Sequence, residues 1–62
     1  MHEWEVKISA AKDEKSLEHK SWVETVKAMD KVEAGSKAIV QAMKKRPNYA
    51  EYHISTIIEV EA

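Results

Sequence analysis

The chain has 62 residues, no cysteine, and a formal charge of −1 from ten basic and eleven acidic side chains. A chain this short forms one domain, residues 1–62, and buries only about 60% of its unfolded surface. The lack of cysteine excludes disulfides and thiolate zinc sites. The charge balance gives no net attraction to nucleic acid or an anionic membrane. No apolar run approaches the ~18 residues of a membrane span, and residues 1–5 do not resemble a signal peptide. We therefore expect a cytoplasmic location with no membrane contact.

The first segment, residues 2–10, alternates strictly between apolar and polar side chains. Its apolar members are Trp4, Val6, Ile8 and Ala10. A period of two places them on one face of a strand, which predicts a half-buried strand. Residues 11–20 are polar and have no period, so they are predicted to form a loop that is long for a hairpin connection.

The second segment, residues 21–29, fits a strand or a helix by periodicity, with Glu24 as the misfit on the apolar strand face. Its β-branched residues favour a strand. Asp30 followed three residues later by Glu33 is typical of a capping box, which marks a helix start and leaves 21–29 as a strand. The alternative is a single helix over residues 16–46, which Asp30 and Gly35 would weaken.

A helix is predicted over residues 31–46. One face of it carries Val32, Gly35, Ala38, Ile39, Ala42 and Met43. The small residues at the centre of this face allow close approach to a sheet that carries two tryptophans. Three consecutive basic residues complement the negative helix end, and Pro47 stops the helix.

The last segment, residues 51–61, is predicted to be a long strand after a turn at 47–50. Its inward side chains are Tyr52, Ile54, Ile58 and Val60, and its outward ones are Glu51, His53, Ser55, Ile57, Glu59 and Glu61. The element order is β-β-α-β, and a right-handed crossover places the third strand parallel to the second, with the first between them. This predicts an α+β fold: a three-stranded antiparallel sheet of order 2-1-3 with one helix on one face.

Catalytic groupings are sparse. The chain has no cysteine nucleophile, no glycine-rich phosphate loop, and no serine beside a histidine–acid pair. His2, His19 and His53 have no metal-ligand spacing. We therefore expect neither an enzyme nor a resident metal or cofactor.

Two surfaces are predicted to bind a protein partner. One is the open sheet face, and the other is the final strand, a long edge with no proline or lysine to block pairing. Together they comprise Val23, Thr25, Met29, His53, Ser55, Ile57, Glu59 and Glu61. A third candidate is phosphate contact by Lys44, Lys45 and Arg46. Because no aromatic residue interleaves with that basic run, the sequence argues against nucleic-acid binding.

The run of residues 22–34, WVETVKAMDKVEA, resembles a strand-to-helix pattern of small bacteriophage host-takeover proteins, among them phage inhibitors of bacterial RNA polymerase. The resemblance implies a compact viral protein that blocks a host complex, such as RNA polymerase or a bacterial defence system, in the host cytoplasm. Glu59 and Glu61 stand where such an inhibitor carries arginines, so no binding residues are carried over. A homodimeric structural or regulatory module and a weak nucleic-acid-binding protein are the alternatives.

Overall fold

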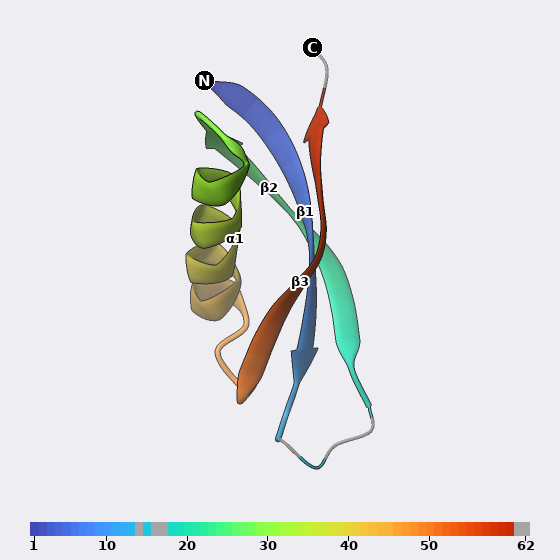
Figure 1. The fold of residues 1–62 in the computed structure, drawn as a ribbon. Coiled ribbons are helices and arrows are strands. Elements are labelled where there is room, and N and C mark those ends of the chain that lie inside the picture. The colour runs from blue at the N-terminus through green and yellow to red at the C-terminus, as the bar shows by residue number, and fades with distance from the viewer. Residues whose placement is uncertain (14, 16–17, 61–62) are drawn as a thin grey trace.

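The structure is a computed structural model that describes residues 1–13, 15 and 18–60. Its elements are β1 (His2–Ala11), β2 (Lys20–Ala28), α1 (Lys31–Lys45) and β3 (Glu51–Val60). The strands form an antiparallel sheet of order β2-β1-β3, and α1 covers one face of it (Figure 1). The predicted α+β fold and strand order are confirmed. The alternative of one helix over residues 16–46 is wrong, because β2 pairs with β1 along its whole length.

Local capping sets both ends of α1. Asp30 is extended, and its side chain accepts a hydrogen bond of 2.9 Å from the N–H of Glu33. The Glu33 carboxylate accepts one of 3.0 Å from the N–H of Met29, one residue before the position that a capping box uses. At the other end Arg46 is the C-cap, and its N–H donates to the carbonyl of Ala42. The helix therefore ends one residue earlier than predicted.

The core lies between small residues of α1 and the inner face of the sheet. Its fully or nearly fully buried members are Val6, Ile8, Val26, Ala28, Ala34, Ala38 and Ala42. Gly35 permits a close approach of α1 to β3. A Cβ atom there would lie 3.0 Å from Cδ1 of Ile54 and 3.4 Å from Cδ1 of Ile57. The predicted packing of small helix residues on the sheet is confirmed.

Two residues predicted to face the core from α1 do not. Val32 has an exposed fraction of 80% and Met43 one of 47%. At about 3.6 residues per turn, the buried stripe through Ala34, Ala38 and Ala42 leaves both side chains at its margin. They lie on the same flank as Gly35, the flank that faces β3.

A β-bulge in β3 changes which residues face the core. Lys7 pairs with Thr56 and the next residue of β1, Ile8, pairs with Ile54, so Ser55 has no partner. An extra residue in one strand reverses the alternation of all residues beyond it. The prediction for the second half of this strand is therefore wrong. Ile57, predicted to face outward, pairs with buried Val6 on the helix side.

Candidate functional site

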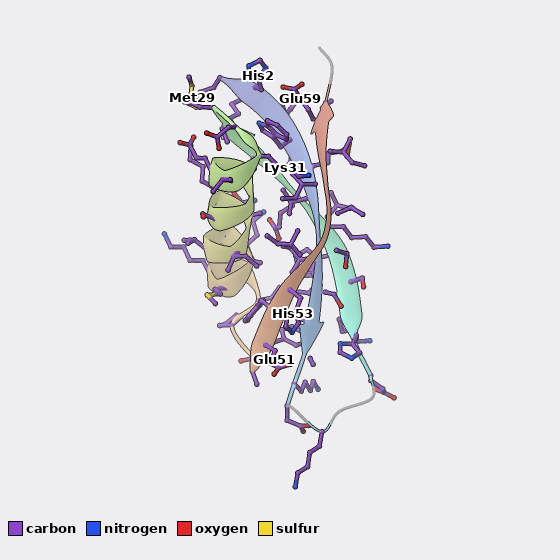
Figure 2. All side chains as sticks on the ribbon, in the orientation of Figure 1. His2, Met29, Lys31, Glu51, His53 and Glu59 are labelled. Carbon is purple, nitrogen blue, oxygen red and sulfur yellow. The ribbon has the colours of Figure 1, made fainter. Side chains whose placement is uncertain are left out.

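The open face of the sheet, opposite α1, carries three of the residues predicted from the sequence. Val23, Thr25 and His53 each pair with an outward-facing residue of β1, and all three are exposed. Met29 is not on this face. It follows β2 just before α1 with an exposed fraction of 63% (Figure 2). The open face therefore extends over both outer strands but does not include Met29.

Ile58 and Val60 lie on the open face, although the sequence predicted that both would face the core. Ile58 pairs with Glu5 and has an exposed fraction of 59%, and Val60 pairs with Glu3 and is half-buried. Sequence reasoning missed Ile58 because it assumed unbroken alternation. The one local sign of a break is that Ile57 and Ile58 are adjacent large apolar residues, which a half-buried strand does not normally carry.

Glu59, near the end of β3, lies on the helix side of the sheet. Glu59 pairs with Trp4, and its Oε1 lies 3.0 Å from Nδ1 of His2 (Figure 2). Because both side chains are about half exposed, water screens this contact. Glu61, the other glutamate of the predicted surface, lies outside the described residues.

The two edge strands differ in how their main-chain groups are used. On β2, the Lys37 ammonium donates to the carbonyl of Lys27 over 2.8 Å, and the Gln41 amide donates to that of Thr25 over 3.4 Å. Side chains of α1 therefore occupy carbonyls that a strand added beside β2 would need. Such cover is one way in which proteins protect a sheet edge.

The main chain of β3 is not covered in this way. Among the described residues, no side chain donates a hydrogen bond to a carbonyl of β3. Exposed apolar groups flank this strand on both sides of the sheet: Ile58 on the open face, and Ile54, with an exposed fraction of 40%, on the helix side. The bulge at Ser55 limits this edge, since a bulge interrupts regular pairing. The regular part of the edge is residues 56–60.

Glu24, the misfit of the sequence pattern, is a buried carboxylate with an exposed fraction of 3%. Its Oε2 accepts a hydrogen bond of 2.6 Å from Nε1 of Trp22. Its Oε1 accepts one of 2.5 Å from the Gln41 amide and lies 3.4 Å from Nζ of Lys45. Burial raises the pKa of Glu24, but the bonds from Gln41, Trp22 and Lys45 and the charge of Lys45 outweigh it, so the pKa is lowered. The carboxylate fixes Trp22 and Lys45 in place.

The predicted phosphate-contact residues separate in space. Lys44 lines a groove between α1 and β2, and Arg46 lines a second pocket of about 420 Å³ at the end of the helix, while Lys45 borders both. The Arg46 guanidinium lies 4.5 Å from the centre of the Trp22 ring, and the Tyr49 ring lies 5.8 Å from that of Trp22. The fold thus places aromatic rings beside the basic run, although the sequence places none within it.

Comparison with protein-family models, with curated proteins and with solved structures finds no match to this chain. Among the described residues, α1 is too short and too polar to cross a membrane.

Proposed function

We propose that this protein is a non-enzymatic protein-binding protein that adds β3 to an extended segment of a partner. The observation that carries the proposal is the difference between the two edges: α1 side chains occupy β2 carbonyls, whereas the described structure has no such bond on β3. In strand addition, the main chain supplies affinity and the side chains on each face supply specificity. Ile58 and Ile54 offer an incoming strand an apolar contact on each face of the sheet.

The partner in this proposal is a host protein complex, and the protein acts as a phage-type inhibitor or adaptor in the host cytoplasm. RNA polymerase and a bacterial defence system are the two classes of target. This part of the proposal rests on the resemblance of residues 22–34 to small host-takeover proteins. A docking protein of this kind needs no catalytic group of its own, because it acts by occupying a surface.

A second copy of the chain is the alternative occupant of β3. Antiparallel self-pairing centred on Ile58 would bring the two Ile58 side chains together on the open face and place Thr56 opposite Val60 of the copy. The bulge at Ser55 would confine this ladder to residues 56–60. Size-exclusion chromatography with light scattering separates the two occupants: a stable monomer removes the homodimer and leaves the partner strand.

The test is affinity capture from a bacterial lysate with three forms of the protein: the natural chain, Ile58→Lys and Val23→Lys. Both substitutions place a lysine on the open face, but on opposite edges. We expect the natural chain and Val23→Lys to retain the same specific protein. We expect Ile58→Lys to retain about tenfold less of it, because a lysine on an edge strand opposes pairing. Equal capture by all three forms, with unchanged circular dichroism, would refute the proposed edge.

A further inference from the structure

The basic end of α1 meets an aromatic cluster that is assembled from distant parts of the chain. Trp22 comes from the start of β2, Arg46 caps the helix, Tyr49 lies in the turn, and Tyr52 begins β3. Tyr49 packs between the other two rings, with centroid distances of 5.8 Å to Trp22 and 5.9 Å to Tyr52. The fold therefore brings to the basic run the aromatic rings that the linear sequence around Lys45 lacks.

The cluster is held in place by hydrogen bonds from both sides. Glu24 accepts from Nε1 of Trp22, whose ring lies against Arg46, and it pairs with Lys45, which lines the pocket. The Tyr52 hydroxyl donates to the carbonyl of Arg46, which ties the helix end to β3. The Trp22 ring supports one face of the Arg46 guanidinium, while Arg46 itself is exposed to solvent. The side chains are therefore positioned before any ligand arrives.

The pocket at this cluster has an excess of positive charge. Lys12, Lys45 and Arg46 line it together with Pro47, Asn48 and Tyr49. Lys45 has a carboxylate partner in Glu24. Within the described residues Lys12 and Arg46 have no carboxylate in ion-pair distance, and these two cations lie beside an amide and a phenol, so they favour an anionic ligand with hydrogen-bonding groups.

The Tyr49 ring and the Arg46 guanidinium, which lies over Trp22, form one wall of the pocket, and this wall narrows the class of ligand. Inorganic phosphate also binds cations, amides and a positioned guanidinium, but it makes no use of the Tyr49 ring. Unpaired bases, in contrast, stack on aromatic rings and on Arg guanidinium planes, and neighbouring basic groups track the phosphates. Bases within a duplex keep their faces covered and cannot use such a wall.

We propose that this pocket binds single-stranded nucleic acid, with a base against Arg46 and Tyr49 and the adjoining phosphates near Lys12 and Lys45. The site lies at the C-terminal end of α1, on side chains other than those of the β3 edge. It does not depend on the proposed protein partner.

The test is fluorescence anisotropy with a labelled oligothymidine of about 12 nucleotides, in about 50 mM salt. We expect binding that is tighter than to a duplex of the same length and to an abasic strand with the same phosphates. Arg46→Lys keeps the charge but loses the planar group, and we expect it to weaken binding at least about fivefold. Tyr49→Leu is expected to have an effect of similar size. Lys12→Ala should lower the slope of log affinity against log salt by about 0.7.

The control is Lys31→Ala, which removes an equal charge at the opposite end of α1 (Figure 2). It should change affinity less than twofold, and circular dichroism should show that every variant is folded. Three results would each overturn the proposal: no binding of the oligothymidine in low salt, equal affinity for the abasic strand, or an equal loss in Lys31→Ala and Arg46→Lys. Displacement of the strand by inorganic phosphate alone at low concentration would reassign the pocket to a simple anion site and would also overturn it.

Discussion

Replacing Glu24 with glutamine should destabilise the fold although the shape of the side chain is kept. The amide retains one acceptor oxygen, so one of the two short bonds, from Trp22 or from Gln41, loses its acceptor and meets an N–H group. Buried hydrogen bonds to charged groups contribute about 1.5–3 kcal/mol each. The lost pair with Lys45 adds at most about 1 kcal/mol, because the Lys45 side chain is 63% exposed and remains solvated. The expected loss in unfolding free energy is about 2–3 kcal/mol, or roughly 10–20 °C in Tm for a chain of this size.

The loss of stability expected for Glu24→Gln also depends on pH. Folding lowers the pKa of Glu24 from its ordinary 4.5, so below that value the unfolded chain binds protons more readily than the folded one. The stabilisation is therefore fully present above pH ~4.5 and is lost as the pH falls through the lower, folded pKa. Glutamine does not titrate. The difference in unfolding free energy between the natural chain and Glu24→Gln should be largest near neutral pH and should shrink in acid.

The assay is urea unfolding followed by far-UV circular dichroism, at neutral pH and near pH 3. Glu5→Gln is the matched control, because Glu5 is an exposed carboxylate on the open face, and it should change stability by less than about 0.5 kcal/mol. If Glu24→Gln is as stable as the natural chain at neutral pH, or if its deficit is the same in acid, Glu24 does not anchor this network.

Three further predictions test the packing, each by thermal or urea unfolding. Ile57→Lys should unfold the chain or cost about 3 kcal/mol, because Ile57 lies on the core side of β3. Ile58→Lys should change the unfolding free energy by no more than about 1 kcal/mol. A larger loss in Ile58→Lys than in Ile57→Lys would show that the bulge is misplaced. Gly35→Ala should be neutral or stabilising by up to about 1 kcal/mol, because the helix gains propensity and the flexible end of Ile54 can move. Gly35→Leu should cost about 1–3 kcal/mol, since nothing there can accept its volume, and unchanged stability would contradict the close approach. Asp30→Ala should cost about 1 kcal/mol through loss of the cap, and no change would mean that the bond to Glu33 contributes nothing.

The elements themselves were predictable because their signals are local. The alternation from Trp4 to Ala10 extends over most of β1, and the Asp30–Glu33 pattern resolved the ambiguity of the preceding segment. Once the helix start was known, chain connectivity and the handedness of the crossover left one sheet order. The elements depend on residues a few positions apart, where periodicity and capping act directly, and the sheet order follows from how the elements are connected.

The candidate sites were less predictable because they depend on pairs that are distant in the chain. The bulge at Ser55 is a property of the pairing between β1 and β3, so the reversal of Ile57 and Ile58 cannot be read from β3 alone. Glu24 looked like a misfit because its partners, Gln41 and Lys45, lie on another element.

By itself the sequence determined the α+β class, the order of elements, the small-residue face of α1 and the position of β3 at an edge. These follow from side-chain periodicity and from main-chain geometry, which are properties of short segments. Only the tertiary structure decided which part of β3 remains regular, and which apolar groups flank it. It also placed Trp22 and Tyr49 beside Arg46. Contacts of this kind arise when whole elements pack together, because the energy of a buried or charged group is set by the neighbours that surround it.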